Sequence, residues 1–234
     1  MSWLHRLFSP KPELTPQQAE RLTAWQALPT SRPNQPIRES RYVVVDVESS
    51  GLNTARDHLI AIGAVAIVNG QIALSDSHEI VLQQTHASDK DNILIHGIGG
   101  TDQREGTPPA EALLDFLAFL RKDPLIAFHV AFDQAMLERA LASFLGLKFE
   151  AVWVDLTYLA PALYPQIANR TRTLDDWAHL FQIHNYARHH ALADALVTAE
   201  LFLALQTRLA ARGAHHLRDM KTLEYNWRRQ IQPV

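Results

Sequence analysis

Apolar runs without polar breaks alternate with segments of helical periodicity along most of the chain. The run at 42–45 is β-branched and aromatic throughout, which is typical of a strand buried on both faces. Two further apolar runs, 58–68 and 71–83, are separated by Asn69-Gly70, and both of these residues tolerate the positive φ of a type I′ turn. The pattern therefore predicts a first strand followed by a hairpin, so that three sequential strands open the domain.

The second half of the chain alternates short strands with helices. Apolar runs at 125–128 and 151–154 predict two buried strands. Between and after them apolar residues recur at helical spacing, and Gly146 and Gly213 stand where two of these segments end. This βα pattern predicts an α/β domain in which helices pack on a mixed sheet. The predicted helices cover 107–122, 132–145, 156–163, 174–181 and 191–211, with a last helix in the tail.

The pattern divides the chain into three parts. Residues 1–40 carry six of the twelve prolines and no strand pattern. We therefore interpret 1–40 as an N-terminal extension, 41–212 as the main domain and 213–234 as a C-terminal tail. The extension begins with an apolar cluster that we expect to dock on the domain, with a protein partner or a membrane surface as alternatives. The cluster consists of Trp3, Leu4, Leu7 and Phe8.

The extension contains one predicted helix. Thr15-Pro16 supplies an N-cap residue and a proline at the first helical position. The helix is expected to cover 16–28 and to turn two apolar side chains inward. The inward pair is either Leu22 with Trp25 or Trp25 with Leu28. We interpret residues 29–40 as a proline-containing linker.

Composition limits the classes of function. The chain has 234 residues, of which 47% are hydrophobic and 20% are charged, and this is ordinary for a globular protein with a sizeable core. It has no cysteine, which excludes disulfides and thiolate zinc sites. The net charge of −3 argues against a surface coated with basic residues for indiscriminate duplex binding, although a local basic groove is compatible with it.

The sequence shows no pattern typical of a targeting signal. Its apolar runs are shorter than the roughly 18 residues that a membrane span needs, so no span is predicted. The N-terminus lacks a long apolar core and a small-residue cleavage site, so we do not interpret it as a secretory signal. Together with the lack of cysteine, this favours a cytoplasmic location.

Two carboxylates follow the first predicted strand. Side chains alternate across a strand, so Asp46 and Glu48 point to the same face and lie side by side. Adjacent anions at the end of a buried strand need a compensating cation, and carboxylate oxygens suit Mg²⁺ or Mn²⁺ rather than a soft metal. The alternative is a polar strand end with both carboxylates in water.

Three later acids have unusual positions. Asp133 opens a predicted helix and Asp155 follows a predicted strand, and for both the helix dipole alone explains an acid in the first turn. Asp194 is different because it lies among alanine and leucine residues of a helix. An acid is rare in such a place unless it is paired or binds a metal.

Three motifs occur along the chain in this order: Val-Asp46-x-Glu48-x-x-Gly-Leu52, Phe132-Asp133 and His189-x-Ala191-x-x-Asp194. They resemble the three motifs of the DnaQ-like 3′→5′ exonucleases of the DEDDh type, and the resemblance covers about 41–205. Weaker matches occur at 95–98, 154–157 and 173–176.

The resemblance implies an RNase H-like fold with an acidic catalytic site. We expect the first three strands to form an antiparallel meander and the later strands to run parallel to the first, with helices on both faces. His189 matches the family's general base, and imidazole suits proton transfer near neutral pH. Its neighbour His190 is expected to be a solvated loop residue. In the family four acids hold two divalent cations, usually Mg²⁺ or Mn²⁺, and here they are Asp46, Glu48, Asp133 and Asp194.

The resemblance also implies a pocket for the terminal nucleotide. Main-chain groups around Glu48, Ser49 and Ser50 are expected to line it, and Leu52 is expected to wedge against the base. His129 stands where the family usually has Asn, and Ser50 where it often has Thr. Two arginines in a turn-like stretch are candidates for phosphate contacts, with a solvated loop as the alternative. The expected substrate-binding residues are Ser49, Ser50, Gly51, Leu52, His129, Phe132, Arg170 and Arg172.

The expected reaction is metal-dependent hydrolysis from the 3′ end of single-stranded nucleic acid, releasing nucleoside 5′-monophosphates, with DNA favoured over RNA. One alternative is an exoribonuclease acting at the same site, and another is a non-catalytic binding module that kept the fold. A serine triad with His189 and Asp194 finds no support, since no Gly-x-Ser-x-Gly elbow is present. The terminal segments are candidates for docking the domain on a polymerase or another protein.

Overall fold

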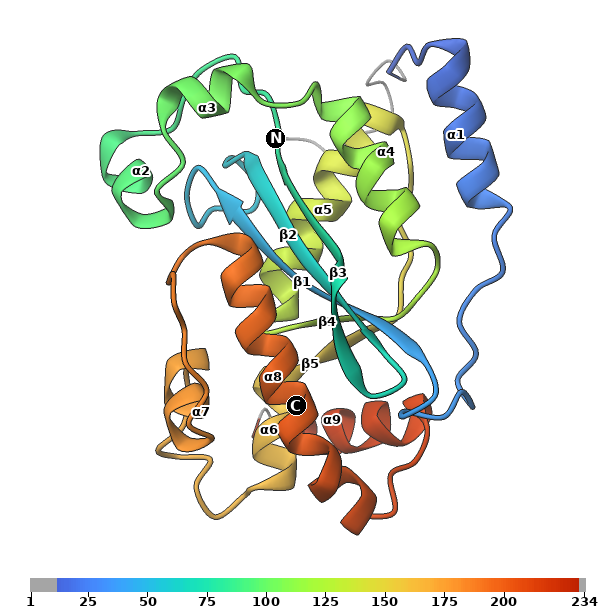
Figure 1. Cartoon of the computed structure of the whole chain (residues 1–234), viewed down its shortest axis with the longest axis vertical. Helices are drawn as coiled ribbons and strands as arrows, with labels where there is room; N and C mark the ends of the chain where they lie inside the picture. Colours follow the sequence, from blue (N-terminus) through green and yellow to red (C-terminus); the bar gives the residue numbers. More distant parts are fainter. Residues whose placement is uncertain (1–11, 232–234) are drawn as a thin grey trace.

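A five-stranded mixed sheet runs through the middle of the molecule (Figure 1). The computed structural model describes residues 12–231. The strands lie in the order β3-β2-β1-β4-β5. They are β1 (Arg41–Ser49), β2 (Leu59–Val68), β3 (Gln71–Val81), β4 (Leu125–Ala127) and β5 (Trp153–Asp155).

The strands pair in the mixed pattern that the sequence predicts. β1 pairs antiparallel with β2, and β2 with β3, whereas β4 runs parallel to β1 and β5 runs parallel to β4. The β2–β3 hairpin turns at Asn69 and Gly70, both of which have a positive φ. Val43, Val44 and Val45 are almost completely buried, so β1 is a core strand. The expected RNase H-like sheet is therefore confirmed.

Helices cover both faces of the sheet, as expected. Val43 and Val45 of β1 pack with α4 (Pro109–Leu120) and α5 (Val130–Leu145) on one face. Tyr42 and Val44 pack on the other face with the helices that follow β5. The alternation of side chains along β1 thus contributes to two separate hydrophobic cores. The later helices are α6 (Leu156–Leu163), α7 (Leu174–Leu180), α8 (Ala191–Ala211) and α9 (Leu217–Ile231).

Two short helices between β3 and α4 differ from the sequence-based expectation, which placed none there. They are α2 (Lys90–His96) and α3 (Gly100–Glu105). A buried glutamine holds this region, because Gln103 donates from Nε2 both to the Ser88 hydroxyl and to the Ile98 carbonyl. Single polar contacts of this kind produce no hydrophobic periodicity, so the pattern carried no signal. β1 continues to Ser49, four residues beyond the apolar run at 42–45, and the other element ends fall within about two residues of the predictions.

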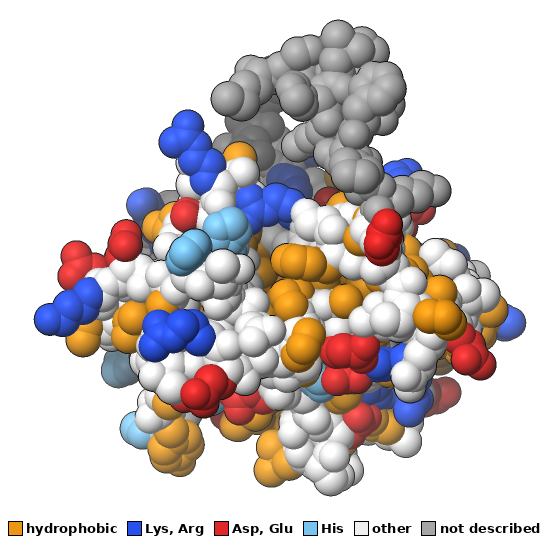
Figure 2. Space-filling view, turned by 90° about the horizontal axis from the view of Figure 1, so that it is seen from above, with side chains coloured by type: hydrophobic (Ala, Val, Ile, Leu, Met, Phe, Trp, Pro, Cys, Tyr) orange, Lys and Arg blue, Asp and Glu red, His pale blue; other side chains and the backbone are white. Residues whose placement is uncertain are grey.

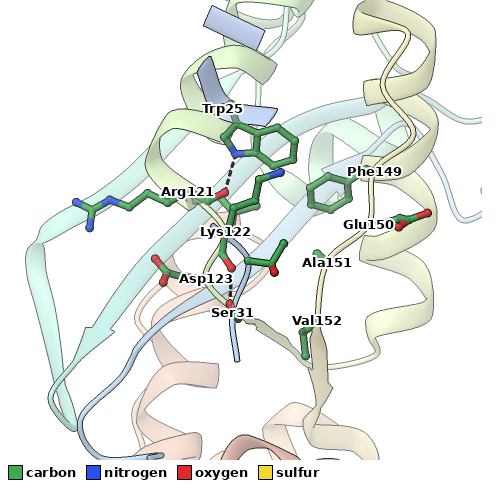
Figure 3. Close-up of a pocket in the computed structure, with 11 residues that line it drawn as sticks. Trp25, Ser31, Arg121, Lys122, Asp123, Phe149, Glu150, Ala151 and Val152 are labelled. Atoms are coloured by element: carbon green, nitrogen blue, oxygen red, sulfur yellow. Dashed lines mark hydrogen bonds between the residues drawn. The ribbon is translucent and has the colours of Figure 1, made fainter. Parts of the chain in front are cut away.

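The N-terminal extension packs on the domain through α1 (Pro16–Gln26). Its buried residues are Leu22 and Trp25, whereas Leu28 lies beyond the helix and is exposed, so the first of the two inward pairs is correct. Figure 3 shows Trp25 Nε1 donating to the Arg121 carbonyl at 2.6 Å, and Lys122 Nζ lies 3.1 Å from the ring centre. The apolar cluster of Trp3, Leu4, Leu7 and Phe8 lies outside the described residues.

The linker and the C-terminal tail pair with each other. The Ile37 N–H donates to the His215 carbonyl at 2.9 Å, and the Leu217 N–H donates to the Gln35 carbonyl at 3.2 Å. The tail forms the predicted helix, α9, which packs beside α6 at the lower end of the view in Figure 1. Residues 29–40 are therefore part of the packed structure rather than a free tether.

The helices of residues 12–231 include none that is both long and apolar enough to cross a membrane. α8 has 21 residues, and charged side chains interrupt its sequence. They include Asp194, Glu200 and Arg208.

Candidate active site

Three carboxylates meet at the carboxyl end of β1. Asp46 and Glu48 project from the same face of the strand, because they lie two residues apart. Asp194 reaches them from the first turn of α8. One carboxylate oxygen from each of the three residues lies within 4.8 Å of the other two. The structure thus joins the two strand acids to the acid that stands out in an apolar helix.

A glycine lets α8 approach the sheet at this point. Gly63 of β2 stands directly opposite Asp46 in the antiparallel register. A Cβ atom at Gly63 would lie 2.1 Å from the Leu192 nitrogen and 2.2 Å from the Ala191 carbonyl carbon. The start of α8 therefore rests on β2, and this carries Asp194 to the strand acids. The sequence reasoning missed Gly63, although a glycine inside an apolar strand is the signal for such a close approach.

Asp133 lies at the edge of this cluster. It is buried in the first turn of α5, and its Oδ1 accepts a hydrogen bond from the Val47 N–H at 3.2 Å. The carboxylate therefore touches the main chain between Asp46 and Glu48. It is not one of the three acids whose oxygens lie mutually within 4.8 Å.

Burial and mutual repulsion make these carboxyl groups hard to ionise. Burial raises the pKa of Glu48 to about 8, with the charge of Asp194 adding to the effect and Arg188 opposing it. Burial also holds the pKa of Asp46 well above its ordinary value, and the charges of the neighbouring acids raise it further. The pKa of Asp133 is raised chiefly by burial, against the opposing effect of its main-chain hydrogen bonds. A buried cluster of oxygen donors with these properties fits a hard divalent cation such as Mg²⁺ or Mn²⁺.

The loop between α7 and α8 is fastened to Asp194. Asn185 Nδ2 donates to Oδ1 of Asp194 at 2.6 Å, and Arg188 Nη1 donates to Oδ2 at 2.6 Å. The same Oδ2 accepts from the main-chain N–H of His189 at 3.0 Å. Arg188 also donates from Nε to Asp175 of α7 at 2.7 Å. Asp194 therefore fixes the segment that carries His189.

The two neighbouring histidines of this loop differ in their contacts. His189 is exposed and has a φ of 60°, in the left-handed region that is unfavourable for a residue with a Cβ atom. The bond from its N–H to Asp194 helps to hold this conformation. His190 is exposed, as expected for a solvated residue, and its Nε2 lies 3.2 Å from Glu79 Oε1 of β3.

The loop after β1 is ordered by an acid that the sequence reasoning did not consider, Asp57. Its Oδ2 accepts from the Asn53 N–H at 2.7 Å. A Cβ atom at Gly51 would lie 2.5 Å from the same oxygen, so this position needs a glycine unless the Asp57 side chain moves. Leu52, at the outer end of the loop, is 88% exposed. The loop thus presents Leu52 to solvent from an ordered base.

The two serines of this loop use their hydroxyl groups within it. Ser49 is buried and donates from Oγ to the Gly51 carbonyl at 2.6 Å. Ser50 Oγ accepts from the His58 N–H at 2.8 Å. Both hydroxyls therefore stabilise the turn.

The other predicted substrate residues lie in different surroundings. His129 precedes α5, is exposed, and has a φ of 69°. Phe132 is partly buried and packs against the core on the α5 side of the sheet. Arg170 and Arg172 are exposed between α6 and α7, and no hydrogen bond joins their side chains to the acids in the part of the chain that is described. Arg188, which the sequence reasoning missed, is the arginine that contacts the cluster.

Asp155 has the structural role that its position suggested. It is the N-cap of α6, and its Oδ1 accepts from the Thr157 N–H at 3.0 Å. Burial raises the pKa of Asp155, and the positive charge of Arg228 on α9 opposes this increase. Arg228 Nη2 lies 3.5 Å from Asp155 Oδ2. This acid therefore helps to start a helix and to attach the tail.

A sequence profile of the RNase T family, described as Exonuclease, matches residues 43–202, which is more than half of the chain. The chain belongs to this exonuclease family. The matched region contains His189 and all four acids of the motifs, so the resemblance to DnaQ-like exonucleases is confirmed. Its members are hydrolases.

The curated relatives of this exonuclease domain include DNA polymerase III proteins. DNA polymerase III PolC-type of Thermotoga maritima is 29% identical over 186 residues, which cover 80% of this chain and 13% of that protein. The DNA polymerase III subunit epsilon-like protein of Rhodobacter capsulatus is 31% identical over 183 residues, which cover 76% of this chain and 25% of that protein. The chain therefore spans a quarter or less of the length of these relatives.

Solved structures share the fold of the exonuclease domain. E. coli Exonuclease I in complex with a dT13 oligonucleotide has a TM-score of 0.64 at 16% identity, covering 74% of this chain and 42% of that chain. Exonuclease X in complex with 5′ overhanging duplex DNA has a TM-score of 0.61 at 16% identity, covering 78% of this chain and 99% of that chain. At this level of identity the likeness concerns the fold, and it agrees with the DnaQ-like sheet.

A groove of about 270 Å³ lies between the start of β2 and α5. It begins one helical turn from Asp133, because Met136 is one of its lining residues. Arg139 and Phe144 add a positive charge and an aromatic ring farther along α5. On the face shown in Figure 2, hydrophobic side chains line a hollow, and Lys and Arg side chains stand near its rim.

Proposed function

We propose that this exonuclease domain removes nucleoside 5′-monophosphates from the 3′ end of single-stranded DNA, using divalent cations held by its acids. The observation that carries the proposal is the approach of Asp46, Glu48 and Asp194 to within 4.8 Å of one another. Because burial and repulsion oppose ionisation there, the cluster gains from binding positive charge. A non-catalytic binding module has little reason to keep such a costly group of anions.

The acids are proposed to hold two cations, Mg²⁺ or Mn²⁺, which when bound would help to activate the attacking water and to stabilise the leaving 3′-oxygen. Asp46, Glu48 and Asp194 supply the converging oxygens. Asp133 is proposed as the fourth ligand, from its position beside the Val47 N–H.

His189 is proposed as the general base that takes the proton of the attacking water. Its exposure leaves the imidazole accessible, and its main-chain bond to Asp194 keeps it next to the acids. An imidazole suits this task near neutral pH. His190 is not assigned this role, because its ring pairs with Glu79.

The terminal nucleotide is proposed to lie against the loop after β1. Main-chain groups of Ser49, Ser50 and Gly51 would contact it, and Leu52 would wedge against its base from the exposed end of the loop. His129 and Phe132 are proposed to face the nucleotide from the start of α5. Arg170 and Arg172 are proposed phosphate contacts for more distant nucleotides, and the groove beside α5, with Arg139, offers a further path for the strand.

DNA is the favoured substrate because the relatives described above are DNA polymerase III proteins, and because Exonuclease I shares the fold and was solved with a dT13 oligonucleotide. The family takes its name from an RNase, and this favours RNA 3′ ends as the second candidate. Discrimination between the two sugars depends on contacts to the 2′-hydroxyl.

The test follows 5′-labelled single-stranded DNA and RNA of one sequence with Mg²⁺, Mn²⁺ or a chelator. A metal-dependent ladder that shortens from the 3′ end is expected, with DNA cleaved faster. Asp46→Ala and His189→Ala should each lower the rate by at least about 100-fold. Asp91→Asn, which removes an exposed acid of α2, serves as the matched control and should cleave like wild type.

Each outcome of this test has a defined meaning. Faster cleavage of RNA would select the exoribonuclease. Cleavage that survives in Asp46→Ala would contradict the site assignment, and no cleavage of either substrate with either metal would favour a binding module.

The terminal segments are proposed to dock the domain on a polymerase or another protein. The matches cover 13% and 25% of the two polymerase III relatives, which supports a polymerase protein as the docking partner. Removal of residues 1–11 keeps the whole sequence of α1 (Pro16–Gln26), so this variant tests docking through the first segment alone. Co-purification with a polymerase catalytic subunit should be lost on this removal; unchanged co-purification would contradict docking through this segment.

A further inference from the structure

Tyr186 stands exposed on the loop that leads to α8. Its side chain is 86% exposed, and among the large hydrophobic side chains of residues 12–231 only Leu52 exceeds it, at 88%. The two residues lie on the two loops that flank the acid cluster. The aromatic ring at position 186 therefore does not contribute to a hydrophobic core. Contact with a ligand would explain an aromatic residue there.

The main chain on both sides of Tyr186 is fastened to the cluster. Asn185 donates from Nδ2 to Asp194 at 2.6 Å and accepts from the Ala187 N–H at 3.1 Å. Two residues after Tyr186, Arg188 donates to the same acid at 2.6 Å. Consecutive Cα atoms are about 3.8 Å apart, so a residue next to Asn185 stays close to Asp194. The exposed ring is therefore presented from an anchored loop beside the acids.

His184 steadies the ring from the side. The two ring centroids are 4.4 Å apart and the planes meet at 69°, which is an edge-to-face contact. The 86% exposure shows that this contact covers little of the tyrosine. Proteins that bind single strands without sequence preference commonly stack successive bases on such open aromatic rings.

We propose that Tyr186, steadied by His184, is a stacking platform for a nucleobase near the 3′ end of the strand whose last phosphodiester lies at the acid cluster. This inference rests on the proposed function and adds a substrate-binding residue to it. Every base has a flat π face, so the contact tolerates any sequence. The ring carries no charge, so its partner is the base rather than the phosphate.

The first test compares Tyr186→Ala and Tyr186→Phe with Tyr225→Ala. Tyr225 is a matched control because it is an exposed tyrosine, at 58%, on α9. For a short oligothymidylate, Tyr186→Ala should raise KM by about fivefold or more, because a stacked base contributes about 1 to 3 kcal/mol and about 1 kcal/mol corresponds to fivefold. The value of kcat should stay within about twofold of wild type. Tyr186→Phe keeps the ring and should behave like wild type, as should Tyr225→Ala.

The second test measures binding without turnover. The fluorescence anisotropy of a 5′-fluorescein oligothymidylate is followed in a chelator, with an abasic nucleotide placed in turn at each of the last positions before the 3′ end. Wild type should lose about fivefold or more in affinity at one of these positions. Tyr186→Ala should bind the intact strand with the same affinity that wild type has for that abasic strand. An abasic nucleotide at the same position should cause no further loss of affinity in Tyr186→Ala.

The outcomes separate this inference from the function on which it rests. If wild type shortens strands from the 3′ end but Tyr186→Ala leaves KM, affinity and the abasic profile unchanged, Tyr186 is a solvated loop residue and the inference fails alone. A fall in kcat without a rise in KM would assign the residue to loop structure and would also overturn it. If wild type shortens neither substrate, the proposed function fails, and the platform fails with it.

Discussion

Gly63→Ala should separate the stability of the domain from the assembly of its acid cluster. The added Cβ would lie 2.1 Å from the Leu192 nitrogen and 2.2 Å from the Ala191 carbonyl carbon. Both atoms belong to the main chain at the start of α8, so no rotation of a side chain can relieve the overlap. The helix start must move away from β2, and Asp194 moves with it.

The size of the effect follows from these distances. Ordinary contacts between heavy atoms are about 3.5 to 4.0 Å, so the start of α8 must retreat by about 1.5 Å. Overpacking of this kind costs about 1 to 3 kcal/mol, which lowers the Tm of a domain of this size by about 2 to 12 °C. A misplacement of about 1 Å at reacting groups costs about 100-fold in rate, so kcat/KM should fall far more than the modest loss of stability implies.

Ala64→Gly is the matched control for this substitution. Ala64 is the buried neighbour of Gly63 on β2 and belongs to the core on the α5 side, so removing its methyl does not touch α8. The loss should be about 1 kcal/mol of stability, with kcat/KM close to wild type. Thermal unfolding followed by circular dichroism, with and without Mn²⁺, and hydrolysis of a labelled oligonucleotide provide the two measurements.

A Gly63→Ala variant that keeps wild-type kcat/KM and a wild-type rise of Tm with Mn²⁺ would refute this reasoning. The contact between β2 and α8 would then not be what positions Asp194. A variant that loses activity only in proportion to the Ala64→Gly control would refute it equally, since the effect would be one of general stability.

Three other expectations concern the cluster, the core and the tail. Asp46→Asn should abolish the rise in Tm that Mn²⁺ gives wild type, because it removes one of the three converging carboxylates; Asp91→Asn, measured alongside by scanning fluorimetry, should keep it. Burial raises the pKa of Tyr42 to about 12, above its ordinary value of 10, so the folded state holds the phenol proton longer than the unfolded state. Wild type should therefore lose up to about 3 kcal/mol as pH rises from 10 to 12, and urea unfolding should show that Tyr42→Phe lacks this slope; an equal slope in both proteins would contradict the assignment. Glu224→Ala should cost about 2 kcal/mol in thermal unfolding, because the buried carboxylate accepts from Lys221 Nζ at 2.7 Å; a change below about 0.5 kcal/mol would show that this pair contributes little.

The parts of the site that the sequence could predict are those that depend on local geometry. Asp46 and Glu48 share a face because a strand has a period of two, and this needs no knowledge of the rest of the fold. The hairpin at Asn69 and Gly70 follows from the backbone conformations that these residues tolerate. Asp194 stood out because an acid in an apolar helix is costly without a partner.

The parts that the sequence could not predict depend on contacts between distant segments. Arg170 and Arg172 stay predicted phosphate contacts, whereas the ion pair between Arg188 and Asp194 was not predicted. The local pattern does not reveal this pair, because it depends on how the loop before α8 folds back onto the helix. Gly63 matters through the approach of α8, which lies far along the chain.

Asp194 connects the acid cluster to the loop that precedes α8, and this gives the residue two roles at once. A carboxylate offers about four lone-pair positions, and three hydrogen bonds reach it from Asn185, Arg188 and the His189 N–H. These three bonds leave about one position free, so a cation bound by the same two oxygens would share them with the donors. We therefore expect occupation of the cluster and the position of the loop to be coupled, in which case each would affect the other by the same free energy. Because the loop also carries Tyr186, contacts of a strand with the loop and cations bound by the acids would then act on one shared carboxylate.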